Sequence, residues 1–96
     1  MDLLVTYDVD TTSTTGARRL RRVAKICEGH GIRVQKSVFE IVCTEAQRVL
    51  LEHQLRETID LQLDSVRIYP LPIRSLDTVS QIGTGVQAHH RGDQII

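Results

Sequence analysis

The sequence predicts an α+β fold with the element order βαββαβ. Two observations lead to this prediction. Strand-like stretches rich in β-branched residues begin at Leu3, Ile32 and Ser65. Between them lie two stretches in which apolar residues recur every three or four positions, as they do along one face of a helix. In this order the elements form the split arrangement known as ferredoxin-like.

The first strand is expected over Leu3–Val9, followed by the polar loop "TTSTTG". Serine and threonine in this loop can cap the helix that is predicted over about Gly16–Glu28. Its buried stripe is formed by Ala17, Leu20, Val23, Ala24 and Cys27. In the following "EGHG", Gly29 or Gly31 is expected to end the helix in the left-handed conformation.

The segment Ile32–Cys43 is predicted to form two strands, because its apolar residues change parity near Lys36–Ser37. A bulge or a tight turn is expected at that point. Thr44 and Gln47 have the spacing of a capping box, which starts a second helix that runs to about Ile59. On this helix, Glu52 and Arg56 are expected to pair across one turn.

The last regular strand is predicted over Ser65–Tyr69, with Pro70 and Pro72 ending it. Residues 79–82 have the composition of one more short strand, which would pair with a sheet edge of its own chain or of a partner. Residues 83–96 are rich in glycine and polar residues, and we expect a flexible tail.

Composition indicates a single small globular domain. The chain has 96 residues, of which 41% are hydrophobic and 25% charged, and a domain of this size gains from oligomerisation. Cys27 and Cys43 follow no metal-binding spacing, so we expect two buried free thiols. No apolar run approaches the ~18 residues of a membrane span, and no signal peptide is visible, so a cytoplasmic location is expected.

Charge is unevenly distributed although the formal net charge is zero. Seven arginines and lysines lie between Gly16 and Lys36, against the single acid Glu28. They form either a solvated helix face or a surface for a polyanion such as nucleic acid. Because aromatic residues are few, contact with phosphates fits this chain better than base stacking does.

Asp8 and Asp10 stand at the end of the first strand. Aspartates are common at strand ends and in turns, which is one explanation. The other is a site for a hard cation such as Mg²⁺, which binds one or two carboxylates and keeps several waters. One aspartate supplies few protein ligands for a metal ion, but a two-fold axis near the strand end would bring Asp8 close to Asp8 of a second copy.

Three stretches, "VTYDVDT", "RRLRRVAKICEGHGIRVQKSVFE" and "DSVRIYPL", together resemble the CRISPR-associated protein 2 family over about residues 3–82. The resemblance is closest to the members that accompany type I-C systems. It implies a nuclease domain over residues 1–82 and a homodimer in which the additional C-terminal strand, about residues 79–82, packs on the partner protomer.

The same resemblance implies that Asp8 of both protomers holds Mg²⁺ or Mn²⁺ and is the catalytic residue, whereas Asp10 lies outside the family pattern. It assigns nucleic-acid contacts to Tyr7, Arg19, Arg22, Arg33, Ser37 and Phe39. The implied function is a metal-dependent endonuclease of spacer acquisition that cleaves RNA, double-stranded DNA or both. The alternative is a non-catalytic dimeric adaptor between protospacer DNA and the CRISPR integrase, CRISPR-associated protein 1.

Overall fold

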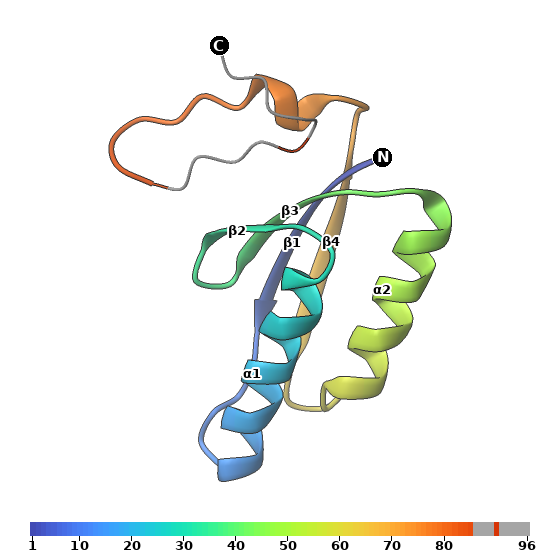
Figure 1. The fold of residues 1–96 in the computed structure, drawn as a ribbon. Helices are drawn as coiled ribbons and strands as arrows, with labels where there is room; N and C mark the ends of the chain where they lie inside the picture. The colour runs from blue at the N-terminus through green and yellow to red at the C-terminus, as the bar shows by residue number, and fades with distance from the viewer. Residues whose placement is uncertain (86–89, 91–96) are drawn as a thin grey trace.

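The computed structural model describes residues 1–85 and 90 and has the predicted element order (Figure 1). The βαββαβ prediction is therefore confirmed, and a short 3₁₀ helix follows the last strand. The elements are β1 (Asp2–Asp8), α1 (Thr14–Glu28), β2 (Ile32–Gln35), β3 (Val38–Val42), α2 (Glu45–Thr58), β4 (Ser65–Leu71) and the 3₁₀ helix η1 (Ser75–Thr78).

The four strands form one antiparallel sheet in the order β2-β3-β1-β4, and both helices cover the same face of it (Figure 1). β1 lies inside the sheet, where Val5 has Phe39 on one side and Ile68 on the other. The core lies between this face and the helices, and its fully buried members include Leu3, Val5, Val23, Phe39, Ile41 and Leu51. β1 is thus paired with β3 on one side and β4 on the other, and its inward side chains pack against the helices.

Alternation along β1 decides which side chains face the helices. Leu3, Val5 and Tyr7 are buried in the helix-covered core. Since successive side chains of a strand point to opposite faces, Asp8 belongs to the other face, which carries no helix. Asp8 is exposed and is the last residue of β1, next to Ser65 of β4.

α1 ends at Glu28 as predicted and begins at Thr14, two residues before the predicted Gly16, but the glycine that follows it does not have the predicted conformation. Ser13 caps the helix by accepting the Gly16 N–H at its side-chain oxygen. Gly29 ends it with φ −72° rather than in the left-handed conformation, which Gly31 does not adopt either, so that prediction is wrong. Gly31 meets a packing requirement instead, because a Cβ there would lie 2.3 Å from the Glu40 carbonyl oxygen.

The strand boundaries differ from the predicted ones by one or two residues: β1 is Asp2–Asp8 rather than Leu3–Val9, and β3 ends at Val42 rather than Cys43. β2 and β3 are separated at Lys36 and Ser37, as predicted, and their register also shifts between Arg33 and Gln35. β4 does not stop before Pro70 but continues to Leu71. β4 is an edge strand, so it has a neighbouring strand on one side only. Proline, which lacks a backbone N–H, is tolerated there because no strand on the outer side needs that hydrogen bond.

α2 begins with the predicted capping box, in which Thr44 and Gln47 exchange hydrogen bonds of 3.1 and 2.8 Å. The predicted pair of Glu52 with Arg56 is wrong. Glu52 instead accepts from Arg48, one turn earlier, at 2.7 Å. Both arginines lie one turn from Glu52, so sequence spacing alone did not distinguish them.

Residues 79–82 form no strand in the single protomer, so a strand there that pairs with a partner stays a prediction. Val79 and Ile82 are 56% and 96% exposed, and residues 79–82 pair with neither edge strand of this protomer, β2 or β4. Before them, Leu76 of η1 is buried and its N–H donates to the buried Asp2 carboxylate at 2.9 Å. Most of the tail predicted to be flexible, residues 86–89 and 91–96, lies outside the described residues. Within the described part of the chain, neither helix is long and apolar enough to cross a membrane.

Candidate metal and nucleic-acid site

Asp8 is an exposed carboxylate at the end of a buried strand. No donor among the described residues reaches its side chain, so its oxygens are available to a ligand. Over residues 1–85 and 90, no group of three or more His, Cys, Asp or Glu side chains is placed to hold a metal ion. An oxygen donor without internal partners suits a hard cation that keeps most of its waters. Within one protomer, Asp8 therefore offers a single carboxylate to such an ion.

Next to Asp8, the side chain of Tyr7 is anchored to the β2–β3 hairpin. Its hydroxyl donates to the Lys36 carbonyl at 3.2 Å and accepts from Arg33 at 3.4 Å. Its ring stacks on Phe39 with centroids 6.1 Å apart, and its backbone N–H donates to the Ser37 carbonyl. The structure thus brings together four residues that the resemblance had assigned to nucleic-acid contact.

These residues differ in how much of each side chain is exposed to solvent. Phe39 has no exposed surface, so its predicted direct contact with nucleic acid is wrong for this protomer. It supports the Arg33 guanidinium, which lies 5.2 Å from its ring centroid. Tyr7 is 6% exposed and contributes mainly to packing. Arg33 is the exposed cation of the group, and Glu28 is 3.8 Å from it.

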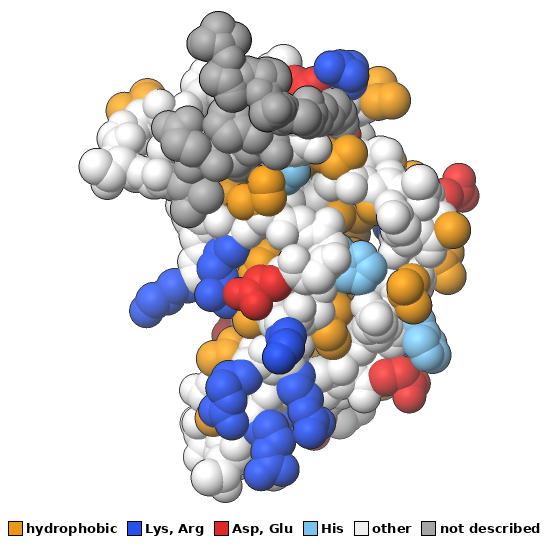
Figure 2. Space-filling model, in the orientation of Figure 1, with side chains coloured by type: hydrophobic (Ala, Val, Ile, Leu, Met, Phe, Trp, Pro, Cys, Tyr) orange, Lys and Arg blue, Asp and Glu red, His pale blue; other side chains and the backbone are white. Residues whose placement is uncertain are grey.

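The cations of α1 fall into two groups. Arg18, Arg21, Arg22 and Lys25 are exposed and form no ion pair with any described residue. Their spacing places them along one face of the helix, about 10 Å long. Figure 2 shows lysine and arginine side chains gathered over α1 and near the β2–β3 turn. We call the four exposed cations of α1 the α1 cation stripe. It contains Arg22, which was predicted to contact nucleic acid.

Arg19 points elsewhere and is committed to Asp64. Its Nε donates to the Asp64 carboxylate at 2.8 Å and its Nη2 donates to the second oxygen at 3.3 Å. The side chains are 15% and 0% exposed. The predicted phosphate contact of Arg19 is therefore not supported by its geometry, since a phosphate would have to replace a buried carboxylate. The hydrogen bond from Arg19 is the main cause that lowers the pKa of Asp64 below its ordinary value.

Asp64 is the residue that sequence reasoning missed. In the sequence it is simply the first residue of the motif "DSVRIYPL", yet its carboxylate also accepts the backbone N–H groups of Asp10 and Asp60. An aspartate before a strand is too common a signal to have revealed these partners. Asp10 itself has the ordinary role expected of it, because its side chain accepts the Thr12 N–H in a local turn. Hydrogen bonds from Thr12, chiefly that backbone one, lower the pKa of Asp10.

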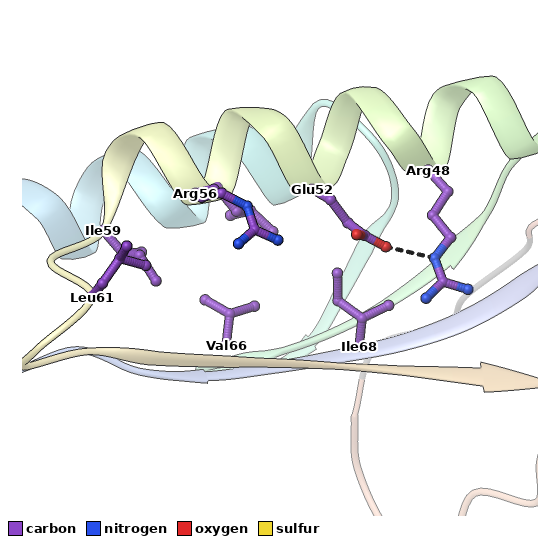
Figure 3. A pocket seen from close by; sticks show the side chains of 8 residues that line it. Arg48, Glu52, Arg56, Ile59, Leu61, Val66 and Ile68 are labelled. Atoms are coloured by element: carbon purple, nitrogen blue, oxygen red, sulfur yellow. Dashed lines mark hydrogen bonds and ion pairs between the residues drawn. The ribbon is translucent and has the colours of Figure 1, made fainter.

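A groove of about 340 Å³ lies between α2 and the edge strand β4 (Figure 3). Apolar side chains line it, among them Ile59 directly after α2 and Val66 and Ile68 of β4, while Arg48 and Arg56 reach over it from α2. Val66 pairs with Tyr7 on the helix-covered face of the sheet. The groove is therefore separate from Asp8, which belongs to the opposite face.

Comparison with known proteins gives a consistent family. The family model described as CRISPR associated protein Cas2 matches residues 1–79. A CRISPR-associated endoribonuclease Cas2 of Moorella thermoacetica is 52% identical over 71 residues, which are 74% of each chain. A CRISPR-associated endonuclease Cas2 of Halalkalibacterium halodurans is 46% identical over 83 residues, 86% of each chain.

Solved structures agree with the fold. A crystal structure of Streptococcus pyogenes Cas2 at pH 6.5 superposes with a TM-score of 0.76 at 46% identity, covering 86% of this chain and all of that one. A hypothetical protein from Thermus thermophilus gives a TM-score of 0.73 at 30% identity, covering 92% of this chain and 96% of that one. The ferredoxin-like arrangement read from the sequence is therefore confirmed.

Proposed function

Because the chain belongs to the CRISPR associated protein Cas2 family, we propose that it is a metal-dependent endonuclease of CRISPR spacer acquisition. It cleaves phosphodiester bonds of RNA, of double-stranded DNA or of both, and Asp8 is its catalytic residue. The names endoribonuclease and endonuclease carried by its relatives support the nuclease activity. The single observation that carries the assignment of Asp8 is an exposed carboxylate, without internal donors, at the end of a buried strand.

A homodimer completes the site in this proposal. The helix-free face of the sheet carries half-buried apolar side chains, including Leu4, Val38 and Val42. A second copy packed on this face through a two-fold axis would cover them and bring its own Asp8 toward the first. The exposed residues 79–82 would gain the ladder they lack by pairing with the sheet of that copy. Carboxylates about 4–5 Å apart would suit one shared cation.

In this proposal, different residues of the chain bind the metal ion, bind the nucleic-acid backbone and support the binding residues. The two Asp8 carboxylates would hold Mg²⁺ or Mn²⁺, which when bound supplies Lewis-acid chemistry at the scissile phosphate. Arg33 and Arg22 are exposed cations that would bind the backbone on either side. Tyr7 and Phe39 would keep Arg33 in place rather than touch the substrate, because both are buried.

Substitution of Asp8 tests this function. Asp8→Asn keeps the shape of the side chain and removes its charge, and we expect cleavage of RNA or DNA to fall about 100-fold or more in Mn²⁺ buffer. Glu57→Gln is the matched control, because it neutralises an exposed carboxylate on α2. Equal cleavage by the wild type, Asp8→Asn and Glu57→Gln would show that the activity does not depend on this site.

The second candidate is a non-catalytic dimeric adaptor that holds protospacer DNA against the CRISPR integrase, CRISPR-associated protein 1. The α1 cation stripe favours it, because exposed cations bind phosphate whether or not a bond is cleaved. The adaptor predicts that Asp8→Asn leaves spacer acquisition in cells intact while Arg18→Glu with Arg22→Glu abolishes it. The nuclease predicts loss in both variants if cleavage is needed for acquisition.

A further inference from the structure

The carboxylate of Asp64 is a junction between three parts of the chain. It accepts hydrogen bonds from the backbone of Asp10 after β1, from Arg19 of α1, and from the backbone of Asp60 after α2. A second Arg19 bond brings the total to four. Since an ionised carboxylate has about four acceptor sites, Asp64 has no free capacity for another ligand.

The loop after β1 is held by this ion pair through both backbone groups of one residue. The Asp10 N–H donates to Asp64 at 3.0 Å, and the Asp10 carbonyl accepts from Arg19 at 3.4 Å. Gly16 lets the loop lie directly on α1, because a Cβ there would be 2.0 Å from the Asp10 carbonyl oxygen. The loop is thus fixed by hydrogen bonds on one side and by close packing on the other.

These contacts leave Asp8 between two anchored neighbours. Tyr7 is tied to the β2–β3 hairpin, and after the buried Val9 comes Asp10, which the ion pair holds. We propose that Asp64, with Arg19, is a positioning residue that holds the Asp8 carboxylate in the orientation needed to bind a divalent cation. The inference rests on the proposed function and assigns Arg19 a role other than phosphate contact.

Mn²⁺ binding to the intact chain tests the proposal without measuring cleavage. Electron paramagnetic resonance counts free Mn²⁺ in titrations of the wild type, Asp8→Asn, Asp64→Asn and Gly16→Ala. We expect Asp8-dependent binding in the wild type, and an affinity about ten-fold weaker in Asp64→Asn and Gly16→Ala, the size typical of removing a group that orients a metal ligand. Glu57→Gln should bind like the wild type.

Each result separates the role in positioning from a role in folding alone. The folded fraction of every variant is measured by circular dichroism under the titration conditions, and affinity is expressed per folded chain. If Asp64→Asn does not fold, Gly16→Ala carries the test together with Arg19→Lys and Arg19→Gln. The lysine variant keeps a cationic donor for Asp64 and should retain more Mn²⁺ affinity than the glutamine variant.

Two outcomes overturn the proposal, and they differ in what they say of the proposed function. If the wild type binds Mn²⁺ through Asp8 and all folded variants of Asp64, Arg19 and Gly16 bind it equally well, the positioning role is wrong and the metal site stands. If Asp8→Asn binds Mn²⁺ as the wild type does, the metal site itself is wrong, and the positioning role fails with it.

Discussion

Replacing Arg22 by glutamine should weaken nucleic-acid binding in a way that depends on salt. Arg22 is exposed on α1 and forms no ion pair with a described residue, so its charge is available to a phosphate. Glutamine keeps much of the length of the side chain and removes the charge. The fold should be unaffected, because the change lies outside the buried stripe of α1.

The size of the effect follows from the charges that the structure leaves free. Each phosphate contact on duplex DNA contributes about −0.9 to the slope of log affinity against log salt, and the proposed homodimer would present each cation twice. Arg22→Gln should therefore make the slope shallower by about 1.8. Over a tenfold change in salt, this alters the ratio of wild-type to variant affinity about 60-fold.

Fluorescence anisotropy with a labelled duplex, measured in EDTA over a range of salt concentrations, separates this effect from cleavage. Arg56→Gln is the matched control, because it removes the same charge from α2, and it should leave the slope unchanged. Arg19→Gln should also leave the slope nearly unchanged, since Asp64 already neutralises Arg19. A slope that changes in Arg19→Gln but not in Arg22→Gln would refute our division of the α1 cations.

Three further predictions concern the fold. Asp64→Asn should lower the free energy of unfolding by about 2 kcal/mol at pH 7. Because the pKa of Asp64 is lowered in the folded state, this difference should shrink as the pH falls below the ordinary value of 3.8, and a difference equal at pH 7 and pH 2.5 in urea melts would contradict it. Burial raises the pKa of the Cys27 thiol to about 12, so iodoacetamide at pH 8 should label it only after unfolding, as mass spectrometry can show. Thr44→Ala breaks the capping box and should cost about 1 kcal/mol, measured as a melting temperature lower by about 4–8 °C; an unchanged melting temperature would refute it.

The features that the sequence predicted well depend on local physics. Apolar periodicity placed both helices and all four strands, and the capping box at Thr44 involves residues only three positions apart. The parity change near Lys36 and Ser37 correctly marked the β2–β3 turn. These signals arise within one element or turn, so no knowledge of the tertiary arrangement was needed.

Apart from the Glu52 ion pair, which is local, the main errors concern features that depend on residues far apart in the chain. Pro70 remains in β4 because β4 has a neighbour on one side only, which strand order decides. Gly31 is needed beside β3 and not for a left-handed turn, because the chain passes close to Glu40. Phe39 is in the core although an aromatic residue in a strand can also bind bases, and the two roles differ only in the face that the strand turns outward.

The distinction between Arg19 and Arg22 shows how far helix spacing alone can reach. Counted from Arg18, the residues Arg21, Arg22 and Lys25 lie three, four and seven positions along the helix, which places all four within an arc of about 100° at about 100° per residue. Arg19 lies about 60° outside this arc. Helical side chains lean toward the N-terminus, so Arg19 leans toward the loop that follows β1. Spacing therefore separates Arg19 from the stripe, but only the fold reveals that Asp64, 45 residues away, meets it there. The α1 cations without an ion pair to a described residue are consequently the four of the stripe, whereas Arg19 bonds Asp64 and the Asp10 carbonyl, through which we propose that it positions Asp8.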